Sequence, residues 1–319
     1  MADLSKEMLD FSEWKGARPH KAELLVPEAS DRRFYLLHYP QTKMVLCHDS
    51  RFNTDYTHLS AWFLARNIRV PRIYRQDPHL GLFLADYCGG RDMSSLGEEE
   101  YEQALYKAID IILAMQKTEP DAVISSRSFD REKLRFELDF FVKHWGLFSA
   151  AEGIVHHITE EVYQELGNLS DYLADKNKKV VVHRDFHSRN IMITDDNEPC
   201  LIDFQDTMMG VRWYDLVSIL FDPYRPLDAA KRDAARDYYR SRSGHDSDRF
   251  ARGYYRTALQ RMFKALGSYY MLVAVKKMDK YRESILPALE NILYILEQDE
   301  FHPCLTDFFT GMYRQVKKS

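Results

Sequence analysis

The sequence predicts an α+β protein made of two unequal lobes, and three observations support this prediction. The first 90 residues contain short segments rich in β-branched and aromatic residues, which are typical of strands. Beyond Gly89-Gly90 the apolar residues recur mostly at helical spacing. The chain has 319 residues, more than one domain of roughly 150 residues accounts for. We therefore expect a small lobe at residues 1–88 and a larger, mainly helical lobe at residues 89–319.

The small lobe is expected to be an antiparallel sheet that carries one helix. Asn53 or Thr54 can cap this helix, and Pro71 ends the segment. Three strands precede the helix and two follow it, an order that suits a small sheet with one covering helix. The expected strands are 22–26, 34–39, 43–48, 73–75 and 82–87. The expected buried stripe of the helix is Tyr56, Leu59, Trp62 and Phe63.

The large lobe is expected to be mostly helical. Its first helix, at residues 98–115, has apolar side chains at a spacing of three or four residues, as Tyr101, Leu105 and Ile109 illustrate. One compact β-rich segment, residues 180–204, interrupts the helical pattern. The other expected helices are 131–145, 156–174, 213–220, 227–241, 247–278 and 285–296.

Composition and charge exclude several classes of protein. The formal net charge is −5 and the isoelectric point is about 6.2, which disfavours a general nucleic-acid binder. The 20 Tyr, 18 Phe and 4 Trp are too many aromatic residues for a disordered chain. No segment approaches the roughly 18 consecutive apolar residues of a membrane-spanning helix, so we expect no membrane span.

The cysteines predict a reduced protein. Cys47, Cys88, Cys200 and Cys304 are far apart in the sequence and form no CxxC pair. This spacing argues against a zinc site and against a disulfide scaffold. The N-terminal residues are charged and contain no apolar signal core. We therefore expect a cytoplasmic location.

The segment 180–193 carries the residues that indicate chemistry. Between two apolar strands lie His183, Asp185 and Asn190, and Asp203 follows at the end of a third apolar strand. Phosphoryl transfer needs a carboxylate that accepts or orients the acceptor hydroxyl proton, and Asp185 has the loop position for it. Asn190 and Asp203 offer the oxygen ligands that Mg²⁺ prefers, and His183 would brace the loop. The alternative, that these are ordinary loop residues, is disfavoured because all four occur together between strands.

These motifs resemble a known family. His183-Arg-Asp-Phe-His-Ser-Arg-Asn190 and the following Leu201-Ile-Asp-Phe204 are similar to the catalytic loop and metal-binding strand of the aminoglycoside phosphotransferase and choline kinase group, relatives of protein kinases. The resemblance implies a protein-kinase-like two-lobed fold that binds ATP under the small lobe. It also implies that Asp185 is the catalytic base, and that Asn190 and Asp203 bind Mg²⁺.

A closer resemblance is to bacterial anomeric kinases of N-acetylmuramate and N-acetylglucosamine. The segments that carry it are 29–34, 67–73, 201–220 and 259–267. It implies phosphorylation of the C1 hydroxyl of an amino sugar in cell-wall recycling. Aminoglycoside, choline and homoserine kinases of the same family remain the alternatives, together with a nucleotide-binding pseudokinase.

The small lobe departs from the protein-kinase pattern. It has no Gly-rich loop, and the segment that contains Ser30 and Arg32 takes that place between two strands. The usual phosphate-binding Lys would fall near Cys47 and is missing. We still expect Ser30 and Arg32 to contact the nucleotide phosphates, and Asp86 and Tyr87 to lie in the linker beside the adenine.

The acceptor side is expected to be basic. Residues 249–282 contain nine Lys or Arg and one acid, so this segment carries +8 in a chain whose remainder carries −13. It forms either a solvated basic helix face or a site where cations such as Arg261 meet an anionic acceptor. A nucleic-acid patch is a third reading that no motif supports. Both favoured readings disfavour a polycationic substrate.

The residues beside the catalytic motifs complete the predicted site. Gln205 and Asp206 follow Asp203 with only Phe204 between, and Arg189 precedes Asn190, so we expect all three to contact the substrate or the transferred phosphate. In the family that the motifs resemble, an Asp near the position of Asp215 supports the catalytic loop from a helix, so the resemblance implies this role for Asp215. We therefore predict an ATP- and Mg²⁺-dependent kinase of a small-molecule sugar, a monomer or weak dimer with no nucleic-acid or membrane partner.

Overall fold

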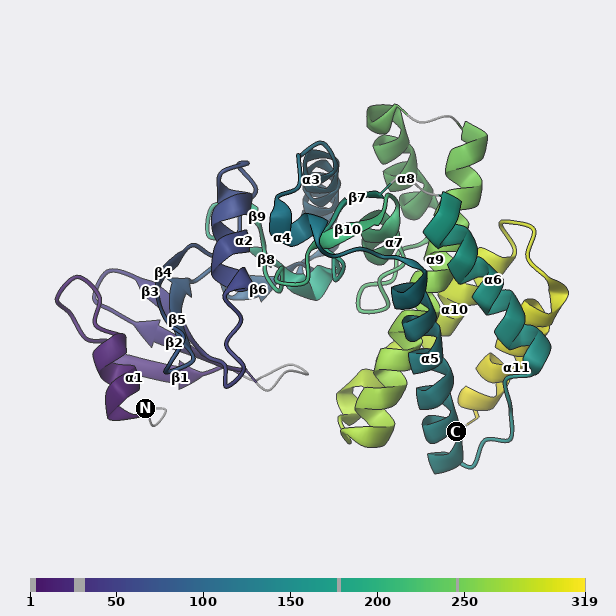
Figure 1. Ribbon diagram of the computed structural model, residues 1–319, viewed down its shortest axis with the longest axis horizontal. Helices are drawn as coiled ribbons and strands as arrows, with labels where there is room; N and C mark the ends of the chain where they lie inside the picture. The colour runs from purple at the N-terminus through teal and green to yellow at the C-terminus, as the bar shows by residue number, and fades with distance from the viewer. Residues whose placement is uncertain (1–3, 26–31, 177–178, 245–246, 319) are drawn as a thin grey trace. The chain divides into compact units, whose positions relative to one another are not determined.

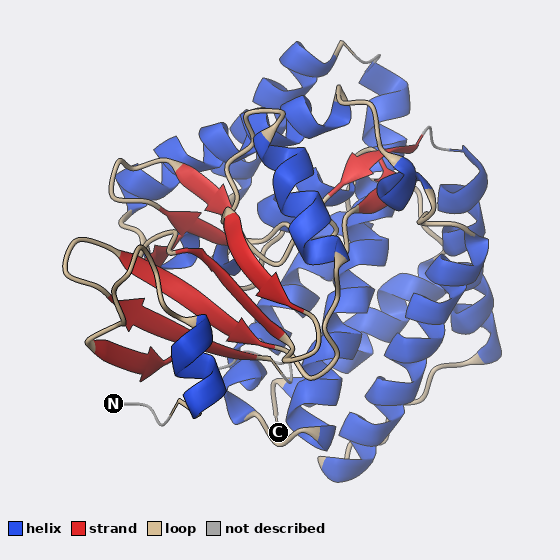
Figure 2. Ribbon diagram, turned by 60° about the vertical axis from the view of Figure 1, so that its left-hand side comes forward, coloured by secondary structure: helices blue, strands red, loops and turns tan. Residues whose placement is uncertain are grey.

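The computed structural model describes residues 4–25, 32–176, 179–244 and 247–318. The chain divides into two compact units, of which unit 1 contains residues 1–95 and 190–205, and unit 2 contains residues 96–189 and 206–319. The predicted α+β class is confirmed: a small antiparallel sheet and a larger helical part are both present (Figures 1 and 2). The division differs from the expected boundary at residue 88 because residues 190–205 pack with the N-terminal segment.

Unit 1 contains a five-stranded antiparallel sheet of strand order β1-β2-β3-β5-β4. Leu37, Leu46 and Leu84 are fully buried in its core, and Leu46 pairs with Leu84 across neighbouring strands. The elements, in chain order, are α1 (Lys6–Phe11), β1 (Lys21–Leu24), β2 (Arg33–His38), β3 (Lys43–His48), α2 (Asp55–Leu64), β4 (Ile73–Asp77) and β5 (Leu82–Asp86). The strands lie within a few residues of their predicted positions, whereas α1 was not predicted.

Helix α2 joins the sheet to the segment that contains Phe204. Its N-cap residue is Thr54, and the preceding Asn53 accepts a hydrogen bond at Oδ1 from the Asp55 amide at 2.8 Å. The predicted stripe is buried, and Tyr56 stacks on Phe83 and on Phe204, with ring centroids 4.8 Å and 4.4 Å apart. Because Phe204 follows Asp203 directly, this stacking fixes the backbone on one side of a predicted metal ligand.

A second, three-stranded sheet of order β6-β8-β9 completes unit 1. Its strands are β6 (Arg91–Asp92), β8 (Ile191–Ile193) and β9 (Pro199–Leu201). The Leu201 amide donates to the Arg69 carbonyl at 2.9 Å, which anchors β9 to the loop before β4. The short 3₁₀ helix η1 (Met93–Ser95) follows β6.

The structure corrects the prediction of a fully reduced chain. Cys88 and Cys200 form a disulfide whose Cα atoms are 6.1 Å apart. The two cysteines are separated by 112 residues, so sequence spacing carried no signal for this pair. They meet because the linker after β5 runs beside β9. Cys47, which is buried, and Cys304 are free thiols.

Unit 2 is helical and is built around α9 (Ser247–Tyr270), against which α5, α7 and α10 pack. The helix predicted to continue to residue 278 changes to a π-helical turn, η3 (Met271–Val275). The other helices are α3 (Glu98–Gln116), α4 (Ala122–Ser125), α5 (Arg131–Ala151), α6 (Glu160–Lys176), α7 (Tyr214–Leu220), α8 (Ala229–Ser243), η4 (Asp279–Ser284), α10 (Ile285–Leu296) and α11 (Pro303–Val316). Of these, α4, η4 and α11 were not predicted.

Two strands of unit 2 frame the predicted catalytic loop. Strands β7 (Lys179–Val182) and β10 (Met208–Val211) pair antiparallel, with Val182 opposite Met208. The chain leaves β7 directly into His183 and enters β10 soon after Asp206. The pairing therefore brings the two predicted functional segments of this unit to the same end of the ribbon. Among the described ranges, none of the helices has the length and apolarity to span a bilayer.

We predict opposite effects for two glycine-to-alanine substitutions. Gly89 has φ of +108° and a Cβ there would overlap the Ile193 carbonyl oxygen, so Gly89→Ala should lower the free energy of unfolding by about 2 kcal/mol. Gly146, in α5, has no neighbour within 4 Å of a built Cβ. Gly146→Ala should therefore raise that free energy by up to about 1 kcal/mol. Urea titrations measure both, and equal effects would contradict the backbone assignment at Gly89.

Candidate active site

A buried carboxylate holds the start of the predicted catalytic loop. Asp215 lies in the first turn of α7, fully buried, and accepts hydrogen bonds from the amides of His183 at 2.7 Å and Arg184 at 3.0 Å. Burial raises the pKa of Asp215 to about 7, although the two amide donors favour its ionised form. The loop-supporting role predicted for Asp215 agrees with these contacts.

A second buried carboxylate, which the sequence analysis missed, holds the far end of the loop. Asp222 follows α7 and accepts from the Ser188 amide at 2.8 Å and the Ser188 hydroxyl at 2.5 Å. It also accepts from the Tyr224 amide at 2.9 Å, and burial raises its pKa. Asp215 and Asp222 are seven residues apart, about two helical turns, and the residues between them are apolar except Ser218. The occurrence of two acids in so apolar a segment is the sequence signal that could have identified Asp222 as a functional residue.

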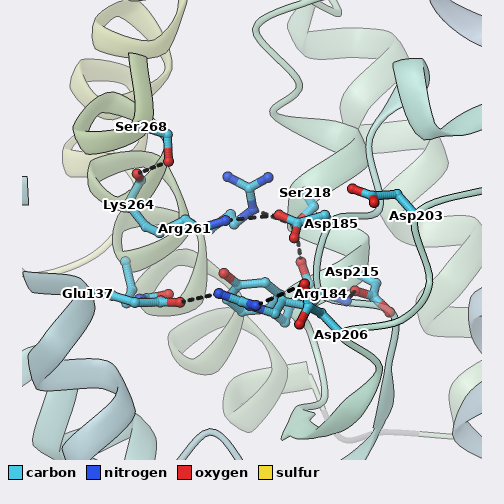
Figure 3. Close-up of polar contacts among 12 residues, drawn as sticks. Glu137, Arg184, Asp185, Asp203, Asp206, Asp215, Ser218, Arg261, Lys264 and Ser268 are labelled. Atoms are coloured by element: carbon cyan, nitrogen blue, oxygen red, sulfur yellow. Dashed lines mark hydrogen bonds and ion pairs between the residues drawn. The ribbon is translucent and has the colours of Figure 1, made fainter. Parts of the chain in front are cut away.

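Asp185 lies between these two anchor points and pairs with a lysine from α9. Its Oδ1 accepts a hydrogen bond from Lys264 Nζ at 2.9 Å, and the two side chains are 23% and 14% exposed (Figure 3). Burial by itself would raise the pKa of Asp185. The positive charges of Lys264, Arg184 and Arg261 outweigh burial and hold this pKa well below its usual range. Asp185 is therefore ionised at neutral pH.

Arg184 is held by acids on both sides. Its guanidinium lies 3.7 Å from Glu137 on α5 and 3.5 Å from Asp206 (Figure 3). Glu137 is buried and also accepts from Gln260 at 2.8 Å. Arg184 has φ of +81°, a left-handed conformation that costs free energy and is common at functional sites. Asp206, a predicted substrate ligand, is half-exposed and contacts Arg184.

The loop contains two histidines, of which His183 is buried and His187 is partly buried. His183 is 1% exposed and its ring lies edge-to-face against Phe186, with centroids 5.8 Å apart, which suits the predicted bracing role. His187 packs edge-to-face against Tyr224, and burial lowers its pKa to about 3. His187 is therefore neutral at physiological pH.

The predicted metal ligands lie side by side in unit 1, at the open end of the β8–β9 hairpin. Ile191 pairs with Leu201, and the Ile202 amide donates to the Asn190 carbonyl at 3.0 Å, so Asn190 and Asp203 flank the same rung. Asp203 has φ of +60°, and its Oδ1 accepts from Gln205 Nε2 at 2.9 Å. The buried Gln205, predicted to bind substrate, thus orients Asp203.

The chemistry of this pair suits a magnesium ion. Asn190 offers an amide oxygen and Asp203 a carboxylate, and Mg²⁺ prefers such hard oxygen ligands while keeping other positions for water or phosphate. The Asp203 side chain is 47% exposed, so a ligand can reach it. Residues 190 and 203 therefore fit a divalent cation.

Arg32 brings a positive charge towards Asp203 from the five-stranded sheet. Its Nε donates to Asp49 Oδ2 at 2.9 Å, and its Nη1 lies 3.9 Å from Asp203 Oδ1. Arg33 pairs with His48 across β2 and β3, which places Arg32 and Asp49 next to each other at the same end of the sheet. Ser30, the other predicted phosphate contact, lies outside the described residues.

The predicted linker residues have partners within unit 1. Asp86 accepts from the Tyr74 hydroxyl at 2.8 Å and from the Arg72 amide at 3.2 Å. Lys43 Nζ lies over the Tyr87 ring, 5.6 Å from its centroid. Contacts of Asp86 and Tyr87 with a nucleotide stay predictions.

Several described cations of the basic segment on and after α9 have separate partners. Arg261 is 6% exposed and its Nε donates to the Ser218 hydroxyl at 2.9 Å, so it lies in the interior beside α7. Other cations of the segment pair with separate acids, namely Arg256 with Asp299, Lys264 with Asp185 and Arg282 with Glu152.

Arg189, the remaining predicted substrate ligand, has its guanidinium 3.9 Å from the Tyr224 ring centroid. Direct substrate contacts of Arg189 and Arg261 stay predictions.

The chain matches one protein-family model and is similar in sequence to several bacterial kinases. A family model described as the phosphotransferase enzyme family, abbreviated APH, matches residues 22–254. The chain is 27% identical over 206 residues to a Neisseria meningitidis serogroup B protein named N-acetylmuramate/N-acetylglucosamine kinase, covering 62% of this chain and 60% of that protein. A Pseudomonas aeruginosa protein of the same name is 26% identical over 220 residues, covering 63% and 60%. The match spans about three fifths of the length of these relatives.

Solved structures show the same fold. The complex of the aminoglycoside phosphotransferase APH(2'')-IIa with streptomycin and ATP superposes with a TM-score of 0.61 at 14% identity, covering 92% of this chain and 99% of that one. The choline kinase LicA from Streptococcus pneumoniae superposes with a TM-score of 0.57 at 14% identity, covering 85% and 94%. The predicted kinase-like fold is therefore confirmed.

We predict that Asp215→Asn lowers both stability and turnover. An amide group offers one acceptor oxygen where the carboxylate offers two, so one loop amide would face an N–H group. The free energy of unfolding should fall by about 2 kcal/mol, and kcat should fall because Asp185 loses its backbone support. Asp307→Asn, at an exposed position on α11, is the matched control. Unchanged kcat in Asp215→Asn would contradict the supporting role.

We predict that stability rises with pH in the acid range because His187 resists protonation. Its folded pKa of about 3 lies below the unfolded value of about 6.5, so the unfolded chain binds the extra proton between these pH values. His187 should therefore contribute a slope of up to about 1.4 kcal/mol per pH unit between about pH 3 and about pH 6.5, and none outside this range.

Urea titrations across the acid range measure that slope. His187→Gln should flatten it, whereas His79→Gln, at an exposed position, should leave it unchanged. Equal slopes in the wild type and in His187→Gln would refute the assignment.

Proposed function

Because the chain belongs to the phosphotransferase enzyme family, whose members transfer a phosphoryl group to a hydroxyl acceptor, we propose that it is an ATP-dependent sugar kinase. Its favoured acceptors are N-acetylmuramate and N-acetylglucosamine, which the names of its relatives specify. The observation that carries the proposal is Asp185, ionised and held in a loop that Asp215 and Asp222 anchor at both ends. ATP is the proposed donor, in line with the nucleotide complexes of structural neighbours.

The proposed role of Asp185 is to orient the acceptor hydroxyl and receive its proton. Phosphoryl transfer through a loose transition state leaves little covalent chemistry to the protein, so positioning dominates catalysis. A carboxylate fixed by its loop and by Lys264 can hold a hydroxyl in line with the transferred phosphorus. The low pKa of Asp185 keeps it able to accept a hydrogen bond over a wide pH range.

Asn190 and Asp203 are the proposed magnesium ligands. A bound Mg²⁺ would supply charge neutralisation at the nucleotide phosphates. Gln205 orients Asp203 through the hydrogen bond to Oδ1. The hairpin rung that joins Asn190 to Ile202 keeps the two ligands together.

Arg32 is proposed to take over the role of the missing third-strand lysine. Cys47 is fully buried at the position where that lysine would fall. Arg32 is held by Asp49 and points its charge towards Asp203, which is where a cation must lie to meet phosphate oxygens. A guanidinium suits this task because it binds phosphate oxygens in a fork.

The charges around Asp185 favour a sugar over a polycationic aminoglycoside. Lys264 pairs with Asp185 itself, and Arg184 lies between Glu137 and Asp206. These contacts neutralise the carboxylates that a polycation would need. The ion pair of Lys264 thus supports the choice of a sugar acceptor through local charge neutralisation. Phosphorylation at the anomeric C1 hydroxyl, monomeric or weakly dimeric assembly, and a cytoplasmic location stay predictions.

We predict ATP- and Mg²⁺-dependent phosphorylation of N-acetylmuramate and N-acetylglucosamine, with no turnover of kanamycin or choline. Coupled ADP release measures the rates, and ³¹P and ¹³C NMR of the product identify the phosphorylated hydroxyl. Asp185→Asn should lower kcat by at least roughly a hundredfold while nucleotide binding is kept. Asp203→Ala should weaken Mg²⁺-dependent ATP binding, which calorimetry measures.

Two outcomes would contradict the proposal in different ways. Turnover with kanamycin alone would replace the sugar with an aminoglycoside acceptor. A wild-type protein that binds ATP but phosphorylates none of these acceptors would favour the pseudokinase alternative.

A further inference from the structure

We propose that Lys264 is a positioning residue for phosphoryl transfer, which fixes the orientation of the Asp185 carboxylate and keeps it ionised. The inference rests on the proposed function, because Asp185 is its reacting group. No motif of the catalytic loop contains Lys264, which comes from α9, 79 residues further along the chain. The contact between Lys264 and Asp185 therefore exists only because α9 packs beside the loop in the folded chain.

The geometry of the pair is that of a strong, partly shielded ion pair. Lys264 Nζ lies 2.9 Å from Asp185 Oδ1, and the two side chains are only 14% and 23% exposed. A charge-assisted hydrogen bond at this distance is stronger than a neutral one and restricts the carboxylate to one orientation. The exposure that remains leaves Asp185 accessible to a small acceptor.

The other cations close to Asp185 have different partners. Arg261 donates to the Ser218 hydroxyl, and Arg184 lies between Glu137 and Asp206. They act on Asp185 through their charge, whereas Lys264 touches it. The charged and titratable groups that interact with Asp185 or Lys264 from the packed elements are Arg184, His187, Tyr214, Asp215, Glu137 and Arg261.

Removal of the Lys264 charge has a defined electrostatic consequence. Burial disfavours an ionised carboxylate, and Lys264 is the strongest opposing influence on Asp185. Without Lys264, the pKa of Asp185 should rise, so a larger fraction of the enzyme carries a protonated Asp185 in mildly acid solution. Because protonated Asp185 cannot accept the hydroxyl proton, the acidic limb of the kcat profile should move to higher pH.

The test compares Lys264→Met, which removes the charge at similar length, with Lys264→Arg, which keeps it. Lys143→Met, at an exposed position on α5, is the matched control. We expect Lys264→Met to lower kcat roughly tenfold to a hundredfold and to move the acidic limb upward by about one pH unit or more. Its KM for ATP should stay unchanged. Lys264→Arg should restore most of kcat and the wild-type limb, and Lys143→Met should match the wild type.

A merely structural role would not produce this pattern. Lower stability of Lys264→Met with an unchanged acidic limb and unchanged kcat per folded enzyme would overturn the proposal. A rise in the KM of the acceptor alone, with kcat and the limb unchanged, would also overturn it and assign Lys264 to acceptor binding.

A direct titration separates this inference from the proposed function. The ¹³C carboxyl signal of Asp185, identified by its loss in Asp185→Asn, reports the pKa in the absence of any acceptor. An upward shift of the Asp185 pKa in Lys264→Met supports the role of the ion pair even if the enzyme does not phosphorylate an amino sugar. The pH profile of kcat is then measured with whichever acceptor the enzyme does phosphorylate. An unshifted signal overturns the inference whatever the acceptor is.

Discussion

The loop that contains the proposed catalytic residue Asp185 depends on two buried carboxylates, which accept hydrogen bonds from its backbone amides and from one of its hydroxyl groups. Asp215 and Asp222 lie about two helical turns apart along and just after α7, and together they hold His183, Arg184 and Ser188. A buried carboxylate is costly unless donors surround it, and a loop with left-handed Arg184 is costly unless anchors fix it. Each feature therefore stabilises the other, and Asp185 acquires a defined place between them.

The same interdependence applies to the charges near Asp185. Glu137, Arg184 and Asp206 form one chain of contacts, and Lys264 pairs with Asp185 in another. Removing one member leaves a partly buried charge without its counterion, which costs more than the pair itself contributes. The site is therefore sensitive to substitutions on α5 and α9, far from the catalytic motif in sequence.

Unit 1 holds two proposed oxygen ligands, Asn190 and Asp203, at one end of a hairpin. The β8–β9 rung keeps Asn190 and Asp203 together, while Gln205 and Arg32 contact Asp203. The disulfide between Cys88 and Cys200 joins this hairpin to the segment after β5. The contacts thus group the proposed metal ligands with the N-terminal sheet, although Asn190 directly follows the loop of unit 2 in the chain.

The α+β class, most strands and helices, and the Asp185, Asn190 and Asp203 motif could be predicted from the residues alone, because periodicity and short spacing are local properties. Which distant residues meet depends on the packing of the folded chain. Lys264 at Asp185, Asp222 at Ser188 and the cysteine pair are separated by 79, 34 and 112 residues. Such contacts depend on how helices and strands pack, and packing leaves no fixed interval in the sequence.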